Sequence, residues 1–76
     1  MNDKRRVALD LSERGHEQLI ALKVATDAPT TSAVLRDALR LYQWAVDQQR
    51  EGFTVGAYQE GPDDIQLREV MMPRGF

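Results

Sequence analysis

Residues 4–11, `KRRVALDL`, have the pattern of a β-strand for which the following sequence offers no immediate partner. The segment alternates three apolar residues with three others: Val7, Leu9 and Leu11 against Arg6, Ala8 and Asp10. This period of two is typical of a strand with one buried and one exposed face. A helix-like stretch follows at once, and the next alternating stretch begins only at Phe53. Because an unpaired strand leaves backbone donors and acceptors unsatisfied, the simplest partner is the same strand of a second chain.

The size of the chain also favours association. A single domain of 76 residues buries only about 60% of its unfolded surface and is marginally stable by itself. The chain has no cysteine and one histidine, which excludes disulfides and a Cys-based zinc site. Oligomerisation is the remaining common source of stability. No Ser/His/Asp or Cys/His set is available for catalysis, so we expect no enzyme, no cofactor and no metal.

The charges are unevenly distributed along the chain. The net charge is −2, yet residues 1–50 hold eight Lys/Arg against seven Asp/Glu, while residues 51–76 hold two against five. A basic N-terminal tip with an acidic tail is compatible with DNA binding. No apolar run approaches the roughly 20 residues of a membrane span, and the N-terminus lacks the apolar stretch of a secretion signal. The sequence therefore predicts a cytoplasmic protein.

Two helices are predicted after the strand. The first begins after Ser12, a favourable N-cap, and ends at Asp27-Ala28-Pro29, since proline disfavours helical geometry in the residue before it. The second is capped by Thr30 or Thr31 and ends at Gly52. It carries a wide apolar stripe, made of Val34, Leu35, Ala38, Leu39, Tyr42, Ala45 and Val46. A stripe of this width exceeds what one short chain covers, so it predicts a helix from a second copy.

The period returns to two beyond Gly52. The stretches `FTVGAYQ` and `IQLREVMM` alternate and are separated by `EGPDD`, whose Gly-Pro and Asp-Asp pairs mark a turn. A C-terminal β-hairpin is therefore predicted. We divide the chain into residues 1–52, a domain for dimerisation and DNA binding, and residues 53–76, a hairpin or tail suited to binding a partner.

Two-fold pairing of the N-terminal strands makes a ribbon whose width matches the major groove of B-DNA. The stretch `RRVALDLSERGHEQL…PTTSAVLRDALRLY` resembles the ribbon-helix-helix (MetJ/Arc/CopG-like) family of DNA-binding proteins over residues 4 to about 50. The resemblance implies a mainly α fold with a short N-terminal strand, forming an intertwined homodimer with an intermolecular antiparallel β-ribbon. The C-terminal hairpin is additional. Ala28-Pro29 departs from the Gly or Asn that usually precedes the second helix of the family.

The resemblance assigns base reading to Arg6, Ala8 and Asp10 and phosphate binding to four further residues: Lys4, Arg5, Thr31 and Ser32. Arginine donates to guanine O6 and N7, and aspartate accepts from cytosine N4. Ala8 offers only apolar contact. An acidic residue in the groove repels phosphates, so we expect modest sequence-independent affinity, and tight binding then requires several dimers side by side on DNA.

Three functions fit this scaffold. The leading one is a dimeric transcriptional repressor that reads a palindromic operator in double-stranded DNA. The second is an antitoxin, which represses its own operon through the same ribbon and neutralises a toxin protein with residues 53–76. The third is a protein-interaction module whose ribbon does not bind DNA, which the low net charge favours.

Overall fold

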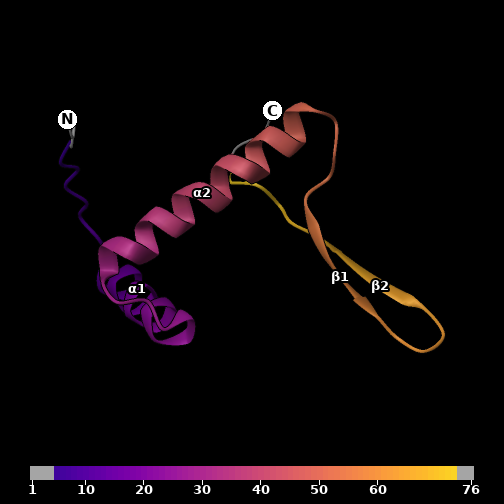
Figure 1. The fold of residues 1–76 in the computed structure, drawn as a ribbon, viewed down its shortest axis with the longest axis horizontal. Coiled ribbons are helices and arrows are strands. Elements are labelled where there is room, and N and C mark those ends of the chain that lie inside the picture. The colour runs from indigo at the N-terminus through magenta and orange to yellow at the C-terminus, as the bar shows by residue number, and fades with distance from the viewer. Residues whose placement is uncertain (1–4, 74–76) are drawn as a thin grey trace. The chain divides into compact units, whose positions relative to one another are not determined.

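The computed structural model describes residues 5–73 and contains two helices followed by a two-stranded hairpin (Figure 1). Helix α1 spans Glu13–Thr26 and α2 spans Thr31–Arg50, while strand β1 spans Gly56–Glu60 and β2 spans Ile65–Glu69. The chain is thus a small mixed α/β protein with two helices and a two-stranded antiparallel hairpin. It divides into two compact units, residues 1–36 and 37–76, with the boundary inside α2. The functional boundary after residue 52 stays a prediction.

The start of α1 is set by Ser12, as the sequence predicts. Ser12 is in an extended conformation, and its side chain accepts a hydrogen bond from the N–H of Gly15 at 3.1 Å. Glu13 lies in the first turn, where a carboxylate interacts favourably with the positive end of the helix dipole. The chain therefore leaves the extended N-terminal segment and enters the helix at a defined residue.

The end of α1 depends on Asp27, which adopts the left-handed conformation with φ 54° and ψ 37°. This geometry lets the N–H of Ala28 donate to the carbonyl of Lys23 at 3.0 Å, and that of Asp27 to Val24 at 3.2 Å. Such bonds satisfy the last carbonyls of a helix. The predicted end at Asp27-Ala28-Pro29 is confirmed, and the residue that reverses the chain is Asp27. Aspartate is one of the few non-glycine residues that enter this region readily.

Helix α2 is capped at both ends by the predicted residues. The Thr30 hydroxyl accepts a hydrogen bond from the N–H of Ala33 at 3.0 Å. At the other end Gly52 has a φ of 92°, and the N–H of Phe53 donates to the Gln48 carbonyl at 2.9 Å. Only glycine adopts such a φ without steric cost. Both caps are local in sequence, which is why the residues alone predict them.

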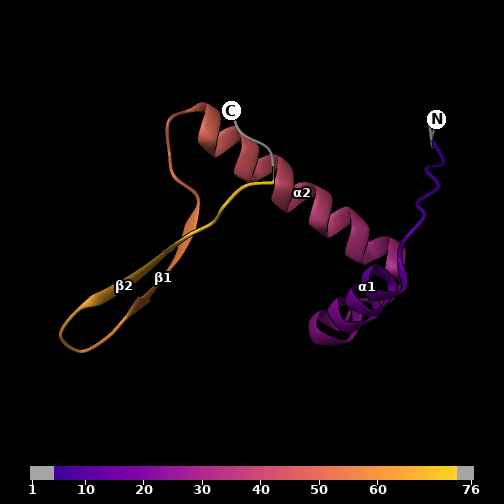
Figure 2. The same cartoon turned by 180° about the vertical axis from the view of Figure 1, so that it is seen from behind.

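The hairpin pairs β1 and β2 antiparallel, with Tyr58 opposite Leu67 at its centre (Figure 2). Its ladder continues beyond the strands at both ends. The N–H of Val70 donates to the Val55 carbonyl at 2.8 Å, and that of Gly61 to the Asp64 carbonyl at 2.7 Å. Pro62 and Asp63 therefore occupy the tip of the turn. The register and the turn agree with the alternation and the `EGPDD` signal in the sequence.

Replacing Gly56 by alanine is expected to disrupt this register. A Cβ at Gly56 overlaps the backbone carbonyl oxygen of Arg68, and a backbone atom moves away only if the strands separate or slip. Cross-strand nuclear Overhauser contacts between Tyr58 and Leu67 should disappear in this variant. The exposed neighbour Ala57, changed to serine, should retain them. Preserved contacts in Gly56→Ala would contradict the close approach of the two backbones.

The core of the single chain is very small. Among residues 5–73 only Val34, Ala45 and Val55 are buried, and α1 contains no buried residue. The stripe of α2 is largely open to solvent, with Leu39 exposed to 67%. Two further residues of the stripe, Leu35 and Tyr42, are also exposed, and so is the neighbouring Trp44. One copy of the chain thus leaves uncovered most of the surface that the sequence pattern marks as core.

Neither helix of residues 5–73 combines the length and the apolar character that crossing a membrane requires.

Candidate nucleic-acid interface

The reading strand is predicted over residues 4–11; its described part, residues 5–11, forms neither helix nor strand in the single chain (Figure 1). The base-reading positions Arg6, Ala8 and Asp10 are all exposed. The apolar positions between them are exposed as well, with Val7 at 87% and Leu9 at 57%. Because the strand is predicted to pair only with a second chain, a single copy does not test it. Both alternating faces of residues 6–11 are exposed to solvent.

The segment is attached to α1 by a short, ordered junction. The side chain of Leu11 lies over Gly15, since a Cβ at Gly15 would come within 3.4 Å of Leu11 Cδ2 and of Ser12 Oγ. The Ser12 carbonyl also accepts a hydrogen bond from the N–H of His16 at 2.9 Å. Gly15 therefore lies against Leu11 and the capping hydroxyl in the first turn. This junction determines where the extended segment leaves the helix.

The N-terminus of α2 has the properties of an anion-binding helix end. Thr31 and Ser32 are its first two residues, and the N–H groups at these positions have no acceptor within a helix. Thr30 accepts from Ala33 and so leaves the N–H groups of Thr31 and Ser32 available. No acidic residue lies in the first turn, so the positive end of the helix dipole is not neutralised there. Backbone N–H groups in this setting bind phosphate well.

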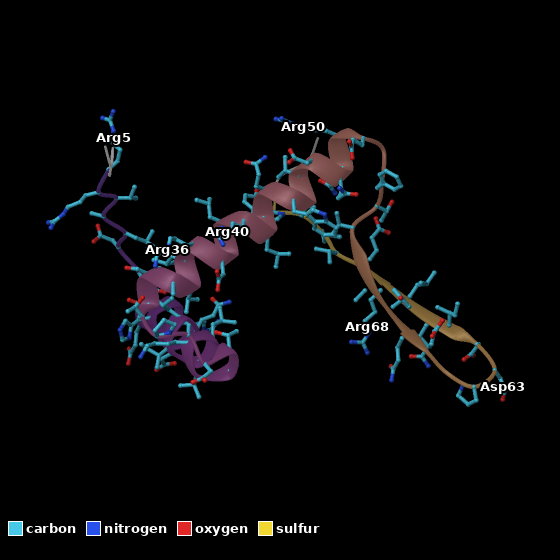
Figure 3. The ribbon with its side chains drawn as sticks, viewed as in Figure 1. Arg5, Arg36, Arg40, Arg50, Asp63 and Arg68 are labelled. Atoms are coloured by element: carbon cyan, nitrogen blue, oxygen red, sulfur yellow. The ribbon has the colours of Figure 1, made fainter. Side chains whose placement is uncertain are left out.

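The first arginine of α2, Arg36, lies close to this helix end in the sequence. Arg36 and Arg40 are exposed and project from α2 (Figure 3). Arg36 lies four residues after Ser32, and residues at this spacing share one helix face. Helical side chains generally lean toward the helix N-terminus, and we therefore expect the Arg36 side chain to reach toward the turn that contains Ser32. Spacing from the helix cap is the signal that identifies it.

The predicted phosphate-binding residues on the N-terminal segment are only partly described. Arg5 is exposed and is labelled in Figure 3, while Lys4 lies outside the described residues. The described part of the segment, residues 5–12, and the first turn of α2 belong to the same compact unit, residues 1–36. Within residues 5–73, no group of three or more His, Cys, Asp or Glu side chains is placed to hold a metal ion.

Comparison with models of known protein families, with curated proteins and with solved structures finds no match for this chain.

Proposed function

We propose that this chain is a sequence-specific DNA-binding repressor of the ribbon-helix-helix type, acting as a homodimer. The observation that carries the proposal is the exposed alternating segment, residues 5–11, that runs directly into a capped helix. Two copies of the segment pair antiparallel and satisfy each other's backbone groups. The resulting ribbon presents Arg6, Ala8 and Asp10 outward and the alternating apolar residues inward.

The dimer is supported by the apolar surface that one chain leaves open. Val7 and Leu9 on the segment and Leu39 on α2 are each more than half exposed. Burial of such side chains stabilises by about 1.5–3 kcal/mol each, and interlocking of two helix pairs beneath the ribbon supplies that burial. A chain of this size gains the stability it lacks by sharing one core between two copies.

The outward-facing residues of the ribbon can make hydrogen bonds and apolar contacts to the edges of the bases. The Arg6 guanidinium donates two hydrogen bonds to guanine O6 and N7, while the Asp10 carboxylate accepts from cytosine N4. Ala8 lies between them and suits the methyl group of thymine. Two-fold symmetry repeats the set in the second half-site, so the preferred operator is palindromic. Each of the two residues thus selects a G·C pair: Arg6 contacts the guanine of its pair, and Asp10 contacts the cytosine of its pair.

Phosphate contacts then position the ribbon in the groove. The N–H groups of Thr31 and Ser32 hold a phosphate at the start of α2, and Arg36 adds a guanidinium to the same group. Lys4 and Arg5 contact phosphates beside the ribbon. The absence of acidic residues from the first turn of α2 keeps this helix end favourable for an anion.

A DNA-binding titration over a series of salt concentrations tests the proposal. The protein is titrated against DNA from its own upstream region and against duplexes of scrambled sequence. We expect specific binding to weaken as salt rises, because each neutralised phosphate releases counterions. Equal affinity for both duplexes at every salt concentration would contradict sequence-specific reading.

A second candidate function, an antitoxin, is favoured by the exposure of the hairpin. Every residue of β1 and β2 is exposed, which leaves their edges open for strand addition to a toxin. Deleting residues 53–76 is then expected to abolish toxin binding and to leave DNA binding largely intact. Co-purification with a co-expressed neighbouring gene product and the same titration measure the two properties. Loss of folding on deletion would instead make the hairpin part of the core.

A further inference from the structure

The C-terminal hairpin consists of two strands that nothing in the described chain covers. Tyr58 and Leu67, which face each other across the strands, are 71% and 78% exposed. An isolated two-stranded hairpin is at best marginally stable in water, whereas three or more strands with an apolar face are stable. Additional strands or packing against a helix would stabilise the hairpin, and the open backbone edges of its strands favour additional strands.

The hydrogen-bond pattern identifies the backbone groups that point away from the hairpin. Val70 is hydrogen-bonded to Val55, and Gly61 to Asp64. Along an antiparallel ladder, hydrogen-bonded residue pairs alternate with pairs that are not hydrogen-bonded to each other. Tyr58–Leu67 is consequently a non-bonded pair. The N–H and C=O groups of β2 that face outward are those of Ile65, Leu67 and Glu69. They form one row along the open edge of the strand.

We propose that β2 pairs antiparallel with β2 of a second copy, with the two Leu67 residues opposite each other on the two-fold axis. In this register all five residues of the strand overlap, and the outward groups of Ile65 meet those of Glu69 of the other copy. Gln66 lies opposite Arg68 of the other copy, where its amide oxygen accepts from the guanidinium. The pairing thus combines backbone hydrogen bonds, a polar contact between Gln66 and Arg68, and apolar contact between the two Leu67 side chains.

Other registers of the same edge lose this complementarity. Centring the pair on Arg68 or on Glu69 places like charges directly opposite each other, which is destabilising. Centring it on Gln66 shortens the overlap to three strand residues and sets Glu69 against Asp63 of the turn. Figure 3 shows Asp63 at the tip of the hairpin and Arg68 toward the opposite end of its strands. The complementary register is thus also the longest one.

The open edge of β1 is less suitable for pairing with a second copy than the open edge of β2. Self-pairing about Tyr58 would set Gly56 opposite Glu60 and Ala57 opposite Gln59. A glycine and an alanine supply little side-chain contact to a partner strand, and glycine weakens a strand interior. Pairing through β2 instead builds a four-stranded sheet in the order β1-β2-β2-β1. Its apolar face combines three residues from each copy: Tyr58, Ile65 and Leu67.

Cysteine cross-linking of the full-length chain tests this interface, since the natural sequence contains no cysteine. In Leu67→Cys the two Cα atoms are expected to lie about 5.5 Å apart, as in a hydrogen-bonded antiparallel pair, which is within the range that a disulfide spans. Tyr58→Cys is the matched control, because both side chains are similarly exposed in one chain. The two Tyr58 positions would be separated by three strand spacings, about 14 Å.

We expect Leu67→Cys to form disulfide-linked pairs under mild oxidation and Tyr58→Cys to remain largely unlinked on a non-reducing gel. Equal linking of the two variants, linking of Tyr58→Cys alone, or no linking of either would overturn the proposal. Cross-strand contacts in nuclear magnetic resonance spectra show that each variant keeps its hairpin. Neither measurement involves DNA or residues 5–11. Failure of the hairpin interface is therefore distinguishable from failure of the proposed DNA-binding function, on which it does not depend.

Discussion

A chain in which aspartate replaces Leu9 is expected to halve the mass of its assembly and to lose specific binding to DNA. Leu9 is the middle apolar residue of the predicted strand, and pairing of two strands buries the Leu9 side chain of each copy. Burying an unpaired carboxylate costs several kcal/mol, which exceeds the contribution of the leucine side chain that it replaces. Sedimentation equilibrium measures the mass, and the salt-series titration measures DNA binding.

Ala8→Asp provides the matched control for this variant. It introduces the same charge one residue along the segment, on the face that the ribbon directs outward. Its assembly mass should equal that of the natural chain, although its affinity for DNA changes. If Leu9→Asp kept its full mass, or if both variants lost it equally, the alternation would not correspond to a buried and an exposed face.

Replacing Arg6 by alanine is expected to weaken binding to the preferred operator by about 1–3 kcal/mol. That corresponds to a loss of affinity of about fivefold to 150-fold, at about 1.4 kcal/mol per factor of ten. The physical reason is the loss of a bidentate contact to guanine. Selection from randomised operator duplexes should show that the preference relaxes at one position in each half-site and stays unchanged elsewhere.

Arg5→Ala distinguishes base reading from general attraction to phosphates. Arg5 is predicted to contact phosphate, so its loss should weaken binding about equally for all DNA sequences. It should also reduce the slope of log affinity against log salt concentration by about one. Arg6→Ala should instead lower the ratio of the affinity for the operator to the affinity for scrambled DNA. Unaltered operator affinity in Arg6→Ala would remove Arg6 from the reading surface and favour the protein-interaction alternative.

Features determined by neighbouring residues are the ones that the sequence predicted well. The caps at Ser12, Thr30 and Gly52 each depend on hydrogen bonds or dihedral angles within a few residues. The hairpin depends on alternation and on a turn of four residues, both of which are visible in the sequence. The assignment of Thr31 and Ser32 to phosphate binding came instead from the family resemblance, and it stays a prediction.

Other parts of the site needed the structure. The sequence left Thr30 and Thr31 both open as caps, and the structure selects Thr30, which fixes the distance of Arg36 from the predicted phosphate-binding end of α2. The role of Gly15 depended on the position of the Leu11 side chain above it. A pattern of residue types does not reveal such contacts, because side-chain direction at a junction depends on the backbone conformation there.

The sequence by itself determined the two helices, their caps and the strand alternation, because these follow from propensities and hydrogen bonds over short separations. Only the tertiary structure decided that Asp27 takes the left-handed conformation and that Gly56 lies against the Arg68 backbone. It also decided that Val34, Ala45 and Val55 are the buried residues of the described chain. These features depend on the backbone conformation that the chain adopts, and the spacing of residue types along a chain does not specify it.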